Sequence, residues 1–231
     1  MSAAFLSSIR SIHYRDHAEQ FLQQSTTRPS SREEIEPWRR GRARYWCWCI
    51  EVDNSAVLAR LENFQQHLSA FLLANYQRQP HITVAVCGFW LSEGDTHRFN
   101  DDFSQSQLAV QRRNLEHLAP EAFKLQVLGG NSFQSAPFLE VVDDSAKGNL
   151  EQLRRCLLDT SDDFRSSAYC PHITLGLYNG EHCTNDLLHR LTLIDDREPL
   201  SLKVSALSLM SYDSADLQGA LKLEQRVLLS D

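Results

Sequence analysis

Hydrophobic residues along the first half of the chain recur with a helical period in some segments and with a strand period in others. Apolar residues recur every three to four positions up to residue 24, in a stripe that includes Phe5, Ile9 and Phe21, which is typical of an amphipathic helix. The segment 45–52 alternates with the two-residue period of a strand. The expected elements are a helix ending near 24, a strand at 45–52, a helix from Asn54 or Ser55 to about 76, a strand at 81–90, a loop at 91–103 and a helix at 106–118.

The second half repeats part of this order. The expected elements are strands at 123–128 and 137–142 with a turn at 129–131, a helix at 146–158, a strand at 172–178, a helix at 185–191, and strands at 202–211 and 221–229. Glycine and asparagine at 129–131 favour a turn between the first two strands. A strand, a long helix and a strand that follows proline therefore occur in both halves.

One four-residue motif begins the strand after the helix in each half. It is Pro-His-Ile-Thr, at 80–83 and at 171–174. Because side chains alternate along a strand, His81 and Thr83 share one face, as do His172 and Thr174, while the isoleucines point to the opposite face. If each half packs its isoleucine face on a helix, the two polar faces can meet across a cleft.

Two histidines flanking one ligand suit phosphodiester chemistry without a metal ion. A neutral imidazole can remove a proton from water, and a protonated one can give its proton to the departing ribose oxygen. The ordinary histidine pKa near 6.5 allows both states near neutral pH. The threonine hydroxyls can hold phosphoryl oxygens.

Composition and charge narrow the function classes. The chain has 231 residues, 42% of them hydrophobic, and a net charge of −7, which argues against a general nucleic-acid binder. No apolar stretch is long enough to span a bilayer, so we expect a soluble cytoplasmic protein with no membrane partner. Arg39, Arg40, Arg42 and Arg44 form a basic run that is either a solvated linker or a phosphate-facing patch.

The cysteines and histidines do not predict a metal site. The six cysteines include no C-x-x-C pair, and the nine histidines form no zinc motif. Cys47 and Cys49 alternate with two tryptophans in a strand pattern, which places both thiols on one face as small buried residues. We therefore expect no disulfide, no metal and no cofactor.

The paired motifs resemble those of the 2H phosphoesterase superfamily, in particular its bacterial 2′-5′ RNA ligase and cyclic phosphodiesterase branch. The resemblance covers roughly residues 45–229 and extends to the strands at 123–127 and 137–141 and to Gly219 with the alternating segment after it. It implies an α+β fold of two pseudo-symmetric lobes, each an antiparallel sheet with helices on its outer face, and an active-site cleft between the lobes.

The resemblance also implies residue roles. His81 and His172 would be the catalytic pair, with His81 as proton donor to the leaving oxygen and His172 as the base for water. Thr83 and Thr174 would bind the phosphate, and no metal would be needed. The substrate would be the 2′,3′-cyclic phosphate of an RNA terminus or nucleotide, and some members also join RNA through a 2′-5′ bond.

Two segments depart from the family pattern. Many members carry a basic residue after the second motif, where this chain has Gly176-Leu177-Tyr178, and Cys87-Gly88-Phe89-Trp90 replaces the usual residues after the first. Trp90 and Tyr178 can either stack on a nucleobase or pack in the structure. The expected organisation is an N-terminal helical appendage at 1–40 and a bilobal domain at 41–231, with lobe one at 41–118 and lobe two at 119–231, acting as a monomer.

Three functions follow from these observations. The first is a metal-independent cyclic phosphodiesterase, with or without RNA ligase activity. The second is a non-catalytic module that binds a nucleotide or an RNA end in the same cleft. The third is a metal hydrolase, which the lack of companion carboxylates disfavours.

Overall fold

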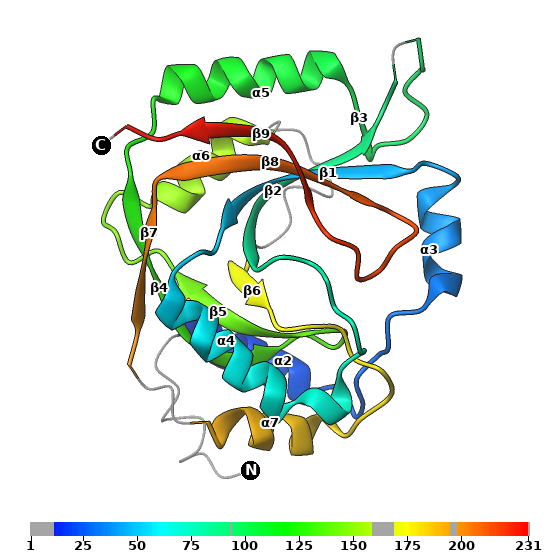
Figure 1. The fold of residues 1–231 in the computed structure, drawn as a ribbon, viewed down its shortest axis with the longest axis vertical. Coiled ribbons are helices and arrows are strands. Elements are labelled where there is room, and N and C mark those ends of the chain that lie inside the picture. The colour runs from blue at the N-terminus through cyan, green and yellow to red at the C-terminus, as the bar shows by residue number, and fades with distance from the viewer. Residues whose placement is uncertain (1–11, 93, 159–168, 195–197, 231) are drawn as a thin grey trace.

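The protein has a two-lobed α+β fold built on two sheets (Figure 1). The computed structural model describes residues 12–92, 94–158, 169–194 and 198–230. The first sheet has the order β3-β2-β1-β8-β9, from Asp102–Phe103, His81–Trp90, Arg44–Glu51, Ala206–Asp213 and Lys222–Leu228. The second has the order β6-β5-β4-β7, from His172–Thr174, Pro137–Val142, Phe123–Ser132 and Leu200–Val204. Apart from the parallel β2–β3 pair, the pairs between these strands are antiparallel, and the expected fold class is confirmed.

The repeated unit is a helix that joins two adjacent antiparallel strands. Helix α4 (Ser55–His67) connects β1 to β2, and α6 (Asn149–Leu157) connects β5 to β6. The Asn54 side chain caps α4 by accepting hydrogen bonds from two backbone N–H groups. The helix ends at His67, well before the expected residue 76, and a 3-10 turn (Ser69–Phe71) follows. Leu72, directly after this turn, is extended and pairs with Tyr178.

Three strand predictions need correction. Strand β4 runs through the expected turn to Ser132, with an irregularity between Val127 and Gly130. A side chain at Gly130 would lie 2.3 Å from the Phe64 ring, so only glycine lets strand and helix approach this closely. Strand β6 has three residues and ends at Thr174. The segment expected as one strand at 202–211 is two strands in different sheets, β7 and β8.

The C-terminal strands therefore return to the first half of the chain. The expectation placed them in lobe two, whereas β8 pairs with β1 and β9 pairs with β8. The helices also cross between the halves. Helix α4 packs against β7 of the second sheet, and α6 packs against β2 of the first, beside α5 (Gln105–Leu118). Each sheet is thus covered by a helix that connects two strands of the other sheet.

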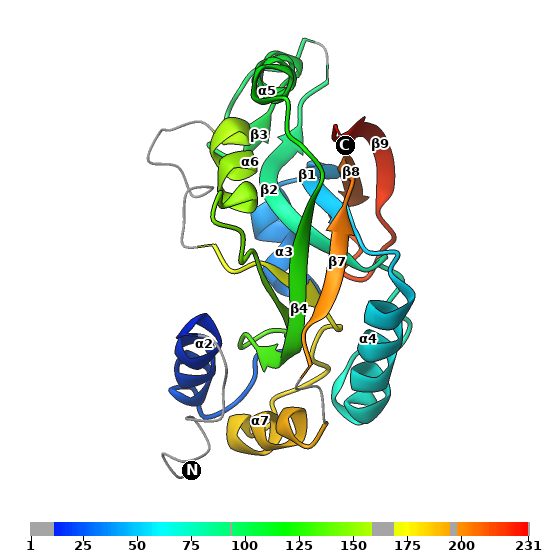
Figure 2. The same cartoon turned by 90° about the vertical axis from the view of Figure 1, so that its left-hand side faces the viewer.

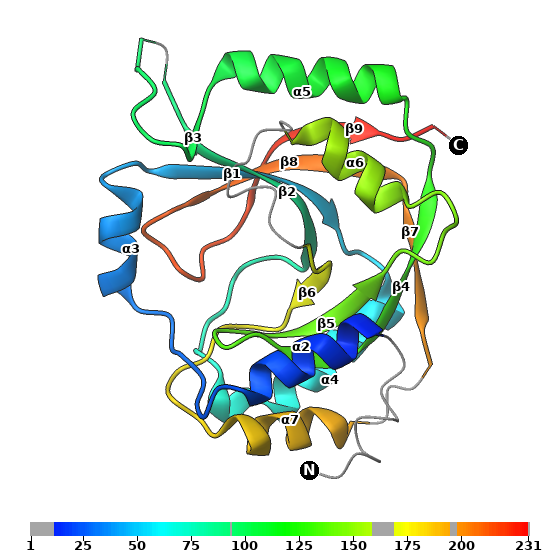
Figure 3. The same cartoon turned by 180° about the vertical axis from the view of Figure 1, so that it is seen from behind.

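The second sheet lies between helices on its two sides (Figure 2). Helix α4 lies on one side of β4, and α2 (Ile12–Leu22) lies on the other. Seen from behind, α2 crosses in front of β5 (Figure 3). Helix α7 (Thr184–Thr192) packs against both α2 and β4. No helix among the described residues is long and apolar enough to cross a membrane.

The described part of the N-terminal segment forms two helices, α2 and α3 (Arg32–Arg39). Phe21 of α2 is buried in the main core cluster, whereas Phe5 and Ile9 of the expected stripe lie outside the described residues. Trp38 of α3 packs on the rings of Tyr45 and Phe89, with centroid distances of 4.9 and 4.7 Å. The segment thus contacts both sheets, and the domain boundary at residue 40 stays a prediction.

The basic run is held by other parts of the protein. Arg42 forms ion pairs with Asp101 and Asp102 at 2.5 and 2.7 Å, and its guanidinium lies 3.8 Å above the Phe89 ring. Arg39 pairs with Glu36, Arg44 with Glu224, and Arg40 lies over the Phe99 ring. The partners of Arg42 and Arg44 fix the end of α3 to the first sheet, so these two residues do not form a free linker, and a phosphate-facing role of the run stays a prediction.

Candidate active site

The two motifs occupy equivalent positions in the two sheets. On β2, His81 lies opposite Glu51 of β1, and Thr83 lies opposite Cys49. On β6, His172 lies opposite Glu140 of β5, and Thr174 lies opposite Phe138. The four motif side chains are half-buried, while Ile82 and Ile173 are fully buried in the core. The strand alternation expected from the sequence is present in both copies.

Both imidazoles are oriented by the same backbone contact. His81 Nδ1 lies 2.8 Å from the carbonyl oxygen of Gln79, and His172 Nδ1 lies 2.8 Å from that of Cys170. A carbonyl can only accept a hydrogen bond, so in each ring Nδ1 carries the proton and donates it. Nε2 is consequently the nitrogen that can gain or release a proton in each neutral ring.

The surroundings of both histidines favour the neutral form. Burial is the largest cause that lowers the pKa of His81 to about 4; the hydrogen bond to Gln79 opposes it, and the charge of Arg78 and the proximity of His172 add smaller contributions in the same direction as burial. Burial also lowers the pKa of His172, with a smaller contribution from His17 and an opposing one from the bond to Cys170. Both imidazoles are therefore neutral in the unliganded protein near pH 7.

Residues outside the motifs tie the two strands together. Strands β2 and β6 are in contact, and the Tyr169 hydroxyl, just before the second motif, donates to the carbonyl of Thr83 at 2.9 Å. Arg154 of α6 donates to the carbonyl of Val84 at 2.6 Å, and Gln65 of α4 donates to that of Leu175 at 2.8 Å. The carbonyls of Val84 and Leu175 each lie three residues after a motif histidine. Arg154 belongs to the second half of the chain and Gln65 to the first, so each motif strand is held by the helix from the other half.

Two phenylalanine rings support the second imidazole. Phe133 and Phe138 lie 5.0 and 5.3 Å from the His172 ring, between centroids. His17 of α2 meets the edges of the same two rings at 5.7 and 6.2 Å. The N-terminal segment thus reaches the immediate surroundings of His172.

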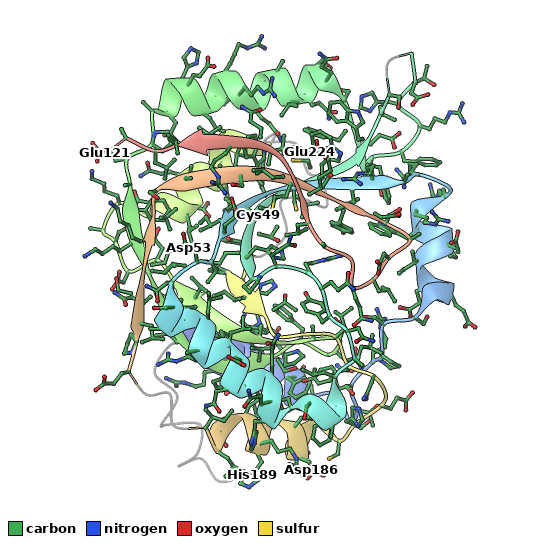
Figure 4. All side chains as sticks on the ribbon, in the orientation of Figure 1. Cys49, Asp53, Glu121, Asp186, His189 and Glu224 are labelled. Carbon is green, nitrogen blue, oxygen red and sulfur yellow. The ribbon has the colours of Figure 1, made fainter. Side chains whose placement is uncertain are left out.

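Two thiols lie on the motif face of the first sheet. The Sγ atoms of Cys47 and Cys49 are 3.3 Å apart and both are buried, as the strand pattern indicated. Cys49 also hydrogen-bonds the Thr83 side chain, and its pKa is raised by the Cys47 contact and by burial. Cys49 lies on β1 in the interior, whereas His189 and Asp186 lie on the outer side of α7 (Figure 4). The described residues contain no group of three or more His, Cys, Asp or Glu arranged to hold a metal ion.

The two aromatic candidates lie away from the motif side chains. Tyr178 is fully buried, and its hydroxyl is 2.6 Å from that of Ser132, so its ring packs in the core instead of stacking on a ligand. Trp90 lies at the opposite end of β2 from His81, and nine residues of strand span about 30 Å. Its ring stacks on Trp46 at 4.3 Å. The packing alternative thus describes Tyr178, whereas half-buried Trp90 packs on Trp46 and its contact with a ligand stays a prediction.

Sequence reasoning missed several neighbours of the motif residues. Arg78, Tyr169 and His17 are single polar residues in segments without a motif, so nothing in their spacing distinguished them. Arg78 and Tyr169 each lie three residues before a motif histidine, but different residue types occupy the two positions, so they form no motif. Gln65 and Arg154 were missed because the crossing of α4 and α6 between the sheets is not visible in the sequence.

Solved structures with this arrangement include E. coli LigT. In its apo form it has a TM-score of 0.50 and 12% identity, covering 83% of this chain and 100% of that one. E. coli LigT complexed with ATP has a TM-score of 0.50 and 13% identity over the same shares. A protein described as a phosphoesterase has a TM-score of 0.51 and 14% identity, covering 81% of this chain and 99% of its own. These likenesses show the fold.

The sequence itself carries the family assignment. No curated protein matches it. The model of the 2′-5′ RNA ligase superfamily matches residues 52–216, which include both motifs and most of both sheets. The chain therefore belongs to the 2′-5′ RNA ligase superfamily of 2H phosphoesterases.

Proposed function

We propose that this protein is a metal-independent phosphodiesterase that opens the 2′,3′-cyclic phosphates of RNA ends or nucleotides, with 2′-5′ RNA ligase activity as a possible second reaction. The observation that carries the proposal is the matched setting of His81 and His172. Both rings have Nδ1 bound to a backbone carbonyl, and both retain Nε2 for proton transfer. The ATP complex of E. coli LigT supports a nucleotide ligand for this fold.

In the proposed reaction, water attacks the phosphorus of the cyclic ester. His172 Nε2 takes a proton from the water as the new P–O bond forms. His81 Nε2, protonated in the complex, gives its proton to the ribose oxygen as the old P–O bond breaks. Thr83 and Thr174 bind the phosphoryl oxygens, which carry the developing negative charge.

The low pKa of His81 must rise for this residue to act as the acid. A single negative charge about 4 Å away contributes about 4 kcal/mol at an effective dielectric constant of 20, which corresponds to a change of about 3 in pKa. A cyclic phosphate bound at that distance would therefore raise the pKa of His81 from about 4 toward neutrality. The substrate itself would charge the acid, and the empty site would hold two neutral bases.

The test is turnover of 2′,3′-cyclic nucleotides and of RNA with a cyclic phosphate end. We expect His81→Ala and His172→Ala each to remove nearly all activity, with a double mutant no worse than either single one, because both act in one transition state. Exposed His117→Ala on α5 is the matched control and should retain activity. Wild-type activity in either motif variant would exclude the two-histidine mechanism.

Two further measurements separate the alternatives. Activity that survives EDTA treatment supports the metal-independent reaction, whereas loss in EDTA and recovery with a divalent ion would support the metal hydrolase. Tight nucleotide binding without turnover of any cyclic phosphate would instead support the binding module.

A further inference from the structure

Arg78 lies beside the first motif and has no function in the mechanism above. It precedes β2 by three residues and is half-buried. Its guanidinium lies 4.1 Å above the Tyr212 ring, and its Nε donates to the carbonyl of Gly219 at 3.3 Å. The ring, a hydrogen bond with the Tyr212 side chain and the Gly219 carbonyl hold the guanidinium in one orientation.

Arg78 differs from its neighbouring arginines in its charge environment. Arg226 pairs with Glu51, opposite His81, and Arg44 pairs with Glu224. Among the residues that the structure describes, no carboxylate forms an ion pair with Arg78. Partial burial of a charge without a counter-charge costs free energy, and an ion-pair partner offsets part of that cost. An anionic ligand would supply such a partner to Arg78.

Several contacts place this cation on the same face as the motif residues. Arg78 lies three residues before His81, and its charge lowers the pKa of that residue. Tyr212, on which Arg78 lies, packs against the cluster that contains Cys49, and Cys49 lies opposite Thr83 in the pairing of β1 with β2. Tyr212 and Cys49 belong to the adjacent strands β8 and β1, next to β2 in the sheet.

We propose that Arg78 binds the phosphate group of the ligand, with its guanidinium fork on the phosphoryl oxygens while the histidines transfer protons. The proposal rests on the proposed function only in taking a phosphate ester as substrate. A planar fork binds two oxygens at once, whereas an ammonium acts as a point charge. Phosphate affinity should therefore differ between arginine and lysine at position 78, and between a charged and a neutral residue there.

The experiment is a calorimetric titration with inorganic phosphate, which needs no turnover. We expect Arg78→Gln to weaken phosphate binding about 10- to 100-fold, the loss of one charge-assisted interaction, and Arg78→Lys to fall between Gln and wild type. Arg113→Gln is the control, since it removes the same charge from an exposed position on α5, and should bind like wild type. Thermal melting confirms that each variant is folded.

The outcomes separate this inference from the proposed reaction. Equal phosphate affinity in wild type and Arg78→Gln would overturn the inference, and so would a wild type that does not bind phosphate. A raised KM for a 2′,3′-cyclic nucleotide in Arg78→Gln, with kcat less affected, would support it. If phosphate binding depends on Arg78 but no cyclic phosphate is opened, the inference stands and the proposed reaction fails.

Discussion

The neutral state of His81 has a measurable effect on stability. The pKa of His81 is about 4 in the folded protein and ordinarily 6.5. Between these two pH values His81 is therefore protonated in the unfolded chain and neutral in the folded protein. The contribution of neutral His81 to the free energy of unfolding is therefore fully present above pH 6.5. It falls as the pH drops and is lost near pH 4. These two values give a loss of about 2 kcal/mol at pH 5 from this residue alone.

The perturbation is His81→Gln, which removes the titrating group. We expect the variant to lose less stability than wild type between pH 7.5 and pH 5, by about 2 kcal/mol. Urea unfolding followed by circular dichroism at both pH values measures the difference, and a constant denaturant slope shows that the unfolded state is comparable. His117→Gln, an exposed imidazole on α5, serves as control. Identical pH dependence in wild type and His81→Gln would refute the reasoning, because it would mean that His81 titrates alike in both states.

Three other substitutions test the surroundings of the motifs. Tyr169→Phe removes the hydrogen bond to Thr83 and should cost about 1 kcal/mol in urea unfolding, with a lower kcat and a KM close to wild type; unchanged kcat would separate this bond from catalysis. His17→Ala removes a positive charge that lowers the pKa of His172, so the His172 pKa measured by NMR should rise, and a fall would contradict the assigned direction. Trp90→Ala should destabilise the fold by about 3 kcal/mol while KM for a cyclic nucleotide stays within about twofold; a large rise in KM would place Trp90 at the ligand.

Local patterns predicted the elements that carry the motifs. Strand β2 has the expected bounds, His81 to Trp90, because Pro80 marks its start and alternation continues to its end. The division of 202–211 into β7 and β8 could not be predicted, because apolar and polar residues continue to alternate through Ser205. The chain changes sheets at this point because of where the second sheet lies, which the sequence does not reveal. The burial of Tyr178 depends on its pairing with Leu72, a contact between distant segments.

The same limit applies to the candidate site. His81 and His172 were identified because the repeated word gives them the same strand context twice. Arg78 has no repeat and no period, and its relation to the motif depends on Tyr212, which is more than a hundred residues away in the chain. Side chains that act through partners on other elements become visible only when those elements are placed.

The exchanged helices make each half of the chain depend on the other for the support of its motif. Gln65 holds the backbone after the second motif, and Arg154 holds the backbone after the first. A single strand-helix-strand unit would therefore lack the donor that supports its own motif, because that donor belongs to the other copy. Separately expressed halves of the present protein should accordingly recover the site only when they are combined.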